Sequence, residues 1–480
     1  MGSIIERCGH TAKILDPYLG DERLEHFDTF FPKLSTTIEE FKPDIIGYSG
    51  IATSYSKTKI LSELVARNYP YVIQIAGGAL ASTCDLLLRH THIGITFHGE
   101  AETSLPVFLA RVAEGKSWTD IAGTSIMTSQ EIVRTEMQQI ADLDSIPLPS
   151  YHLVDVKDYF QSTAERLAAY GQTLSPVAYA NIVKVVGTKT HYVPIFASRG
   201  CTNKCLFCHR NYKGIRRHSV EHVITHIKYL IRTYGVSGFS FGDELFNSDY
   251  NWVMSFCDAV EKNGLDICYI IQGARVDKVD RKMLQRLKET GCIEIAYGQE
   301  SGSDIILKEL RKGASKERNT EITLLTQEMG LMSGVQIVVG SPSETTTTVR
   351  ETIQFLKDTK SFIIGFNYLT PLPETPIWEY VQRNNLIPDV EDYLDKVAAL
   401  GTAPLVNLTQ EPTAIWSGWG FLIHKELRLY YYKMTKSYCA YLFLYLRLYL
   451  AGLIRRIFPT SIRALFPKRL LNLVYNRLSN

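Results

Sequence analysis

Three cysteines stand within eight positions of the segment RGCTNKCLFCHR (Arg199 to Arg210), in a chain that holds nine cysteines over 480 residues. Cys201, Cys205 and Cys208 have the spacing CxxxCxxC, which lets three thiolates converge from one short loop. Structural zinc sites usually take four ligands from two separated pairs, and no second pair of cysteines lies nearby. Three thiolates suit a 4Fe-4S cluster that keeps one iron open for chemistry. The alternative is a zinc knuckle with His209 as the fourth ligand.

Six apolar runs from Tyr192 onward alternate with helical stretches, as a barrel of βα units requires. The runs are YVPIFAS at 192, GFSFGDE at 238, ICYIIQG at 267, IEIAYGQ at 293, GVQIVVG at 334 and IIGFNYLTP at 363. Glycine ends the helices between them, as expected for left-handed C-caps, at Gly235, Gly264, Gly291 and Gly330. We therefore predict a partial TIM-like (β/α)6 barrel over 191–410, with the cysteine loop directly after its first strand.

The first 140 residues also alternate strands and helices, which predicts a parallel, Rossmann-like sheet. The expected strands are AKILD at 12, DIIGYSG at 44, YVIQIAGG at 71 and IGITFHGE at 93. Glycines follow these strands, and the carboxyl ends of parallel strands are where such sheets bind nucleotide-like cofactors. The alternative is that the glycines only turn the chain. The prolines of LDSIPLPSYHLVD predict an extended linker over 141–190.

Together these features resemble the radical S-adenosylmethionine (SAM) superfamily and, with the upstream sheet, its cobalamin-binding branch. The resemblance rests on the cysteine motif, which has Phe207 just before its last cysteine, and on motifs that follow in order. These are FSFGDELFN with Gly242, Asp243 and Glu244, YGQESGS with Glu300 and Ser301, VVGSPSET, and TPLPETPIW. In the last motif Glu374 replaces the family's glycine, a departure that bears on the geometry of that turn.

The resemblance implies that the open iron chelates the amino and carboxylate groups of SAM. The reduced cluster then cleaves SAM to a 5'-deoxyadenosyl radical. On this basis Glu244 accepts from the SAM amino group, Glu300 and Ser301 face its ribose or methionyl part, and Phe207, Gly242 and Asp243 lie beside it.

The resemblance also implies a cobalamin site in the first sheet. The loops YSGIATS, GGALAS and HGEAE match the family's three loops and supply the candidate contacts Ser49, Thr53, Gly77, Gly78, Gly99 and Glu100. Leu80 departs from the family, whose second loop usually carries a histidine there. The family's opening strand is also missing, so we expect a sheet without its first strand, from an incomplete gene model or a degenerate domain.

Charge is spread unevenly along the chain. The net charge is +2, but Lys425 to Asn480 holds eleven basic residues and the single acid Glu426, about +10, which leaves about −8 for the rest. The body of the protein thus has no basic field, which disfavours a nucleic-acid partner. Unevenly spread cysteines and an N-terminus without an apolar signal core indicate the cytoplasm.

Residues 411–480 are expected to form a helical, basic and aromatic C-terminal extension. Its apolar run from Ser437 to Ile454 contains Arg447 and falls short of the ~20 uninterrupted apolar residues of a spanning helix. The run predicts either an interfacial helix in peripheral contact with a membrane or a helix packed over the open side of the barrel.

The resemblance implies an enzyme that functionalises an unactivated carbon, with methylation as the leading reaction. In that version one SAM methylates cobalamin and a second supplies the radical. The alternatives are a radical cyclase, rearrangement enzyme or oxidoreductase without methyl transfer, and a non-catalytic iron-sulfur or cobalamin sensor. A transfer-RNA methylthiotransferase is disfavoured, because it needs a second set of three cysteines and only Cys8 and Cys84 precede the linker. The expected partners are a small-molecule substrate, lipid-like or tetrapyrrole, and an electron donor such as flavodoxin or ferredoxin.

Overall fold

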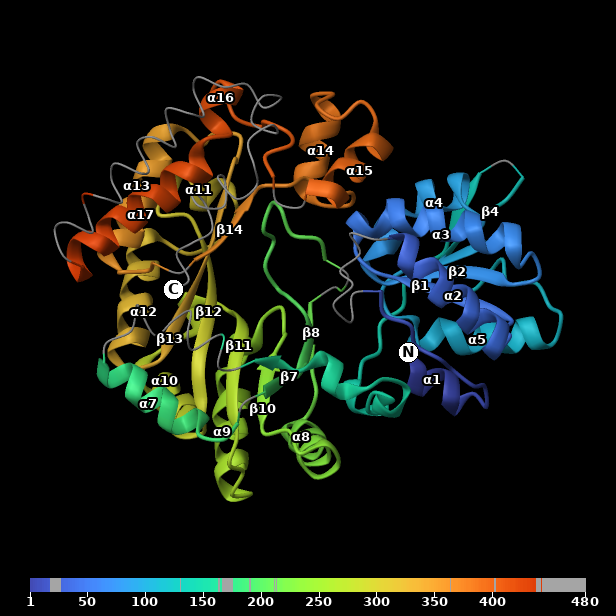
Figure 1. Ribbon diagram of the computed structural model, residues 1–480, viewed down its shortest axis with the longest axis horizontal. Helices are drawn as coiled ribbons and strands as arrows, with labels where there is room; N and C mark the ends of the chain where they lie inside the picture. Colours follow the sequence, from blue (N-terminus) through green and yellow to red (C-terminus); the bar gives the residue numbers. More distant parts are fainter. Residues whose placement is uncertain are drawn as a thin grey trace.

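The computed structural model contains two main sheets joined by a linker (Figure 1). It describes residues 1–17, 27–129, 131–162, 165, 176–189, 191–210, 212, 214–362, 364–400, 403–436 and 442. The first sheet has the order β1-β2-β3-β4-β5, with β1 (Ile45–Ser49), β2 (Ile73–Gly77), β3 (Ile95–Phe97), β4 (Thr124–Met127) and β5 (Ile132–Arg134). β1 to β3 are parallel, which confirms the predicted Rossmann-like sheet, and β4 and β5 extend it in antiparallel fashion.

Helices accompany the strands of this first sheet. They are α1 (Gly2–Arg7), α2 (Phe27–Phe41), α3 (Tyr55–Asn68), α4 (Cys84–His90) and α5 (Ala101–Ala113), with 3-10 turns η1 (Ala52–Ser54) and η2 (Gly78–Thr83). The core of the sheet is formed by apolar residues of β2 to β4 and of α5, including Ile95 and Phe108.

The expected strand at Ala12–Asp16 is wrong, because the structure has no strand there. A strand needs a neighbour to take its backbone hydrogen bonds, and within the described residues β1 pairs with β2 alone and forms the edge of the sheet. Its residues are half-buried or exposed, whereas the middle of β2 is buried. This open edge agrees with a sheet that lacks its first strand.

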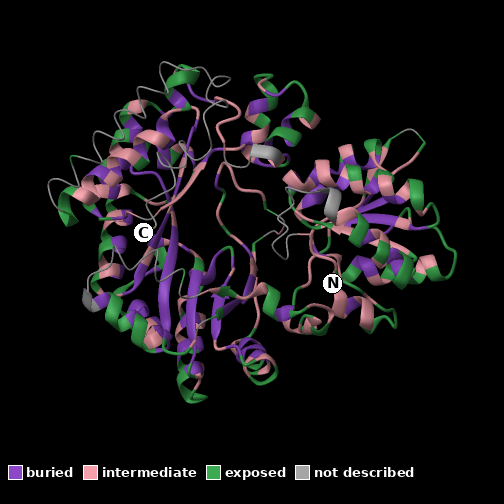
Figure 2. Ribbon diagram, viewed as in Figure 1, coloured by how far each residue is buried: buried purple, intermediate pink, exposed green. Residues whose placement is uncertain are grey.

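The second sheet has the order β14-β13-β12-β11-β10-β7-β6. Its strands are β6 (Gln161–Ser162), β7 (His191–Ile195), β10 (Gly238–Phe241), β11 (Cys268–Ala274), β12 (Cys292–Glu300), β13 (Met332–Val339) and β14 (Ile364–Tyr368). β7 and β10 to β14 are parallel and correspond to the six predicted runs, and β6 pairs antiparallel with β7. The sheet curls into a half-barrel whose strands are mostly buried (Figures 1 and 2). The predicted partial barrel is thereby confirmed.

Capped helices separate the barrel strands. They are α8 (Val220–Tyr234), α9 (Tyr250–Lys262), α10 (Arg281–Glu289), α11 (Asp304–Glu309), α12 (Lys316–Glu328) and α13 (Thr346–Asp358). Side chains of Ser219, Asp249, Asp280, Ser315 and Thr345 accept backbone N–H groups at the starts of α8, α9, α10, α12 and α13. The predicted C-terminal glycines all have left-handed backbones, with φ of +67°, +57°, +101° and +80° in chain order.

The linker has more structure than the prolines alone predicted. It contains the 3-10 turns η3 (Leu143–Ser145), η4 (Tyr151–Leu153) and η5 (Val156–Tyr159), followed by β6 and α7 (Pro176–Val186). After the barrel come α14 (Pro376–Arg383), α15 (Val390–Leu400), α16 (Thr413–Trp416) and α17 (Trp419–Thr435). No helix in the described part of the chain is long and apolar enough to cross a membrane. The run from Ser437 to Ile454 lies outside the described residues, apart from Leu442.

A carboxylate on α15 fastens the first sheet to the barrel side of the molecule. Glu391 accepts hydrogen bonds from Tyr55 and from Lys59, whose Nζ lies 2.8 Å from Oε1, and His90 Nδ1 lies 2.8 Å from Oε2. Burial opposes ionisation, but the hydrogen bonds outweigh it and lower the pKa of Glu391 to about 2. The two parts are therefore held together by an ionised group at neutral pH.

Replacing Gly273 with alanine should destabilise the fold. A Cβ at this position in β11 would lie 2.0 Å from the carbonyl oxygen of Asp243, so the backbone must shift, at a cost of about 1–3 kcal/mol. The midpoint of urea unfolding, followed by circular dichroism, should fall. Gly94→Ala is the control, because its Cβ would meet only the Gln74 carbonyl oxygen at 4.0 Å. Equal midpoints for wild type and Gly273→Ala would contradict this packing.

Candidate functional site

The cysteines lie in the connection between two short strands, and the first of these strands comes between them and the first barrel strand. The predicted position directly after the first barrel strand is therefore wrong in detail. β8 (Ser198–Gly200) pairs antiparallel with β9 (Ile215–Arg217), and Cys201 follows β8 at once. Gly200 has φ +88°, and a Cβ there would lie 2.3 Å from the carbonyl oxygen of Gly214. Only glycine fits this turn, which aims the chain into the cysteine loop.

Backbone hydrogen bonds fix the middle of the cysteine loop. The N–H of Leu206 donates to the carbonyl of Leu310 at 3.0 Å, and the carbonyl of Leu206 accepts from the N–H of Ile377 at 2.9 Å. Within the loop the N–H of Cys208 donates to the carbonyl of Cys205 at 3.4 Å. The loop is thus attached to the ends of β12 and β14 through the elements that follow them.

The three thiols lie on this loop, and Cys201 and Cys205 act electrostatically on Cys208. Cys205 is buried, and Cys201 and Cys208 are half-buried. Burial raises the pKa of Cys205 and raises the pKa of Cys208 to about 11, and the neighbouring thiols add to both shifts. Metal binding must therefore release protons from these groups. A donor set of three thiols on one fixed loop fits a 4Fe-4S cluster with one open iron.

Asp243 holds the start of the cysteine loop in place. Its two carboxylate oxygens accept the N–H of Ala197 at 3.1 and 3.2 Å, and one also accepts the hydroxyl of Ser198. The side chain is buried, and burial raises the pKa of Asp243 while these hydrogen bonds oppose the shift. Its carboxylate is occupied by the loop, so in this structure Asp243 positions the cysteines.

Glu244 presents an accessible carboxylate beside the thiols. The residue is exposed, yet partial burial of its carboxyl group by the surrounding protein raises the pKa of Glu244. Its charge acts on the thiol of Cys208. The preceding Gly242 makes room for the ring of Phe196, which would lie 2.7 Å from an added Cβ. A carboxylate in this position can accept hydrogen bonds from a cationic group that binds beside the cysteine loop.

Glu300 and Ser301 end β12 in a strained turn. Glu300 has φ +63°, a left-handed backbone that costs a non-glycine residue about 1–2 kcal/mol. Its Oε1 accepts from Lys312 Nζ at 2.9 Å. Ser301 is buried, and its hydroxyl lies 3.1 Å from that of Thr352 and accepts the N–H of Ser303. Both predicted SAM contacts therefore have protein partners, and Lys312 is a cation that the sequence did not point to.

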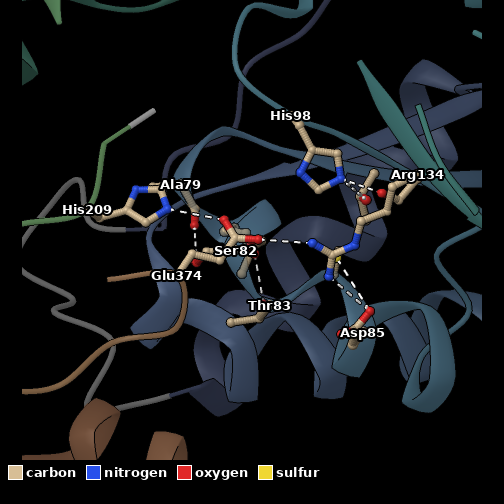
Figure 3. A network of polar contacts seen from close by, with 12 residues as sticks. Ala79, Ser82, Thr83, Asp85, His98, Arg134, His209 and Glu374 are labelled. Carbon is tan, nitrogen blue, oxygen red and sulfur yellow. Dashed lines mark hydrogen bonds and ion pairs between the residues drawn. The ribbon is translucent and has the colours of Figure 1, made fainter. Parts of the chain in front are cut away.

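Glu374 has φ +64°, a left-handed backbone that glycine adopts easily. Figure 3 shows its carboxylate between His209 and Arg134: Oε2 lies 3.5 Å from His209 Nε2, and Oε1 accepts from Arg134 Nη1 at 3.2 Å. Arg134 also donates to Asp85 at 3.1 Å. His209 is the fourth ligand in the alternative zinc knuckle, and its Nε2 points toward Glu374. This network links β5, the cysteine loop and the turn after β14.

Glu100 joins the first sheet to the hairpin of the cysteine loop. Its carboxylate accepts from Arg199 Nη1 at 3.0 Å and from Arg216 Nη1 at 2.6 Å, and the N–H of Ile140 donates to it at 2.6 Å. Burial alone raises the pKa of Glu100, but these hydrogen bonds outweigh it and the net shift is downward. Arg199 also donates to Glu102 at 2.7 Å. Glu100 was predicted as a cobalamin contact, and in this structure both of its oxygens are engaged by the protein.

The loops of the first sheet face the barrel across a cavity of about 460 Å³. Its lining comes from three places: Thr53 and its neighbours after β1, Phe207 of the cysteine loop, and the ends of β13 and β14 with α15. Ser49, Gly77, Gly78 and Gly99 lie at the carboxyl ends of β1 to β3, outside this lining. Leu80 is fully buried in an apolar cluster that includes Ile306 and Ile377, so this position is part of the core.

Comparison with known proteins finds a family model and several relatives that resemble this chain. Residues 195–356 match the family model described as the radical SAM superfamily. An uncharacterized methyltransferase of Pyrococcus horikoshii is 26% identical over 79% of this chain and 76% of its own length. An anaerobic magnesium-protoporphyrin IX monomethyl ester cyclase of Cereibacter sphaeroides is 24% identical over 75% of this chain and 57% of its own length. The radical SAM methyltransferase TsrM of Kitasatospora setae, solved with tryptophan and a SAM analogue, has the same fold, with a TM-score of 0.62, 17% identity, and coverage of 80% of this chain and 72% of its own.

Glu344, in the turn after β13, should make stability depend on pH. Burial raises the pKa of Glu344 to about 7, although its Oε2 accepts the N–H groups of Gly340 at 2.5 Å and Ser341 at 3.3 Å. A carboxyl whose pKa is raised on folding stabilises the fold below about pH 4.5, and this stabilisation is lost as the pH rises through 7. The urea midpoint should therefore fall between pH 5 and pH 8, and Glu344→Gln should flatten this change. The exposed Glu317→Gln should behave as wild type, and an unchanged slope in Glu344→Gln would refute the assignment.

Proposed function

We propose that this chain, whose residues 195–356 match the family model of the radical SAM superfamily, is a cobalamin-dependent enzyme that methylates an unactivated carbon of a small molecule. One observation carries the proposal: the cavity beside the cysteine loop is lined both by Phe207 of that loop and by Thr53 of the first sheet. A cofactor on the first sheet and a cofactor on the cysteine loop can thus reach one substrate. The methyltransferase of P. horikoshii supports methyl transfer as the reaction.

The positions of the residues support the following assignment of cofactor contacts. Cys201, Cys205 and Cys208 hold the 4Fe-4S cluster, and Glu244 binds the amino group of SAM. Phe207 packs beside SAM, and Glu300 fixes the strand end against which SAM lies. When bound, the cluster and SAM supply a carbon-centred radical, and cobalamin supplies a methyl group. The protein orients them and excludes water from the space between them.

Other predicted contacts keep a positioning role in this proposal. Gly242, Asp243 and Ser301 shape the loops around SAM, while Ser49, Thr53, Gly77, Gly78 and Gly99 form the edge against which cobalamin lies. Glu100 holds this edge to the cysteine loop through Arg199. The corresponding domains are 1–140 for cobalamin, 141–190 for the linker, 191–410 for the radical SAM barrel and 411–480 for the extension.

A second candidate function keeps the radical but omits methyl transfer. The cyclase of C. sphaeroides, which acts on magnesium-protoporphyrin IX monomethyl ester, favours a cyclisation or oxidation of a tetrapyrrole. A non-catalytic sensor fits less well, because an accessible Glu244 beside the thiols would have no use there. The reaction also needs a one-electron donor, for which we propose a flavodoxin or ferredoxin of the cytoplasm.

Spectra of the protein distinguish these functions. We expect protein purified without oxygen from cells supplied with cobalamin to show a cob(II)alamin signal beside an iron-sulfur signal that SAM perturbs, in visible and electron paramagnetic resonance spectra. Cys205→Ala should lose the iron-sulfur signal and SAM cleavage, whereas Cys8→Ala, an exposed cysteine of the first domain, should keep both. If the purified protein shows a cluster signal that SAM perturbs but contains no cobalamin, this would contradict methyl transfer and favour the cyclisation or oxidation function. An intact cluster in Cys205→Ala would overturn the cluster assignment itself.

The basic C-terminal extension is proposed to contact a membrane surface. Its eleven Lys and Arg residues from Lys425 onward favour anionic lipid. The full chain should float with vesicles that contain phosphatidylserine and stay behind with phosphatidylcholine alone. The double change Arg455→Glu and Arg456→Glu should weaken flotation. Absence of any retention on anionic vesicles would remove the basis for a lipid-like substrate.

A further inference from the structure

A group of potential metal ligands lies outside the site described above. Asp144 belongs to the linker turn η3, His218 stands just before α8, and His222 lies in the first turn of α8. Among the described residues, this is the one group of three or more His, Cys, Asp or Glu side chains whose ligand atoms all lie within 4.8 Å of one another. No motif of the radical SAM barrel accounts for it.

The ligand atoms have the spacing of a single-ion site. His218 Nδ1 lies 3.0 Å and His222 Nδ1 lies 3.6 Å from the same oxygen, Asp144 Oδ1. The two imidazoles stack with centroids 4.2 Å apart and an angle of 14° between their planes. Metal–ligand bonds of about 2.0–2.2 Å place neighbouring ligand atoms roughly 3–3.5 Å apart. The two distances to Asp144 Oδ1 are close to this spacing, and all three ligand atoms lie within 4.8 Å of one another.

The protein holds each of these side chains in position. The N–H of Ser219 donates to both carboxylate oxygens of Asp144, at 3.0 and 3.2 Å, and the N–H of Asp144 donates to Asp142 at 3.0 Å. The backbone of His218 is bonded to Ala197 at 2.9 Å and to the indole of Trp252 at 2.9 Å. In known metal sites, hydrogen bonds of this kind orient the side chains that bind the metal.

The set of donor atoms also suits a cation. The side chains are mostly covered, with 13% of His218, 18% of His222 and 31% of Asp144 exposed. Imidazole nitrogens and carboxylate oxygens are the donor atoms that first-row divalent ions take in proteins.

We propose that Asp144, His218 and His222 bind a first-row divalent metal ion of the zinc class. Two imidazoles and one carboxylate, with at least one position left for water, are a known ligand set for such ions. The ion would join the linker to the start of α8. Because β9 precedes His218 and pairs with β8 next to Cys201, the ion would also stabilise the base of the cysteine loop.

X-ray absorption at the zinc edge tests the site without any mutation. The full chain, with its iron-sulfur cluster reconstituted without oxygen, receives one equivalent of Zn²⁺. We expect a shell of nitrogen and oxygen atoms at about 2.0–2.1 Å with the scattering pattern of imidazole. A sulfur shell at about 2.3 Å would place the zinc on the cysteines and overturn the proposal. Failure of the chain to retain Zn²⁺ at micromolar concentration would overturn it as well.

Matched variants identify the ligands. His222→Phe keeps an aromatic ring stacked on His218 but removes the ligand nitrogen. Its affinity for Zn²⁺, measured by competition with a coloured chelator, should fall by at least about tenfold, because changing even a residue that only hydrogen-bonds to a metal ligand causes a loss of that size. The control is His152→Phe. His152 is largely exposed and lies on the linker that also carries Asp144, so this variant should bind Zn²⁺ as wild type does. Unchanged affinity in His222→Phe, or an equal loss in His152→Phe, would contradict the site. An unchanged iron content shows that each variant keeps its cluster loop.

Discussion

The buried carboxylate of Glu100 is the interaction on which the arrangement of the site depends. Its side chain is fully covered, and it receives Arg199 and Arg216 from the two strands of the hairpin, which stand on either side of the cysteines. A buried charge is tolerated only when it is paired, and loss of one partner typically costs about 3–5 kcal/mol. The first sheet therefore cannot separate from the hairpin without leaving a buried charge uncompensated. The cysteine loop takes its position relative to β3 from this constraint.

Two strained residues near the same loop have basic side chains as partners. Glu300 and Glu374 both have left-handed backbones that glycine adopts more easily. Glu300 is paired with Lys312, and Glu374 with Arg134 and His209. Strained residues persist only where the surrounding structure determines them, and they cluster at functional sites. The side chain of Glu374 thus adds a contact between the first sheet and the cysteine loop that a glycine could not make.

The hairpin of β8 and β9 is fixed from several sides at once. Asp243 binds its first strand, and Arg217 donates to the carbonyls of Leu245 and Phe246 behind its second strand. Glu100 holds it from the first sheet, and Asp144 reaches the residue that follows it. The thiols are consequently presented by a rigid framework, which suits a site that must keep a reactive radical away from water.

Local patterns were sufficient to predict the cysteine motif, the six parallel barrel strands and the helix-ending glycines. Each rests on short-range physics: thiol spacing on one loop, runs buried on both faces, and the left-handed backbone that glycine allows. The sequence could not predict that Glu100 meets Arg216, 116 residues away, or that Glu374 meets Arg134 across 240 residues. It also placed a strand at Ala12–Asp16 that found no partner. Long-range pairs carry no periodic signal, so only the packing of the two sheets decides which charges become buried together.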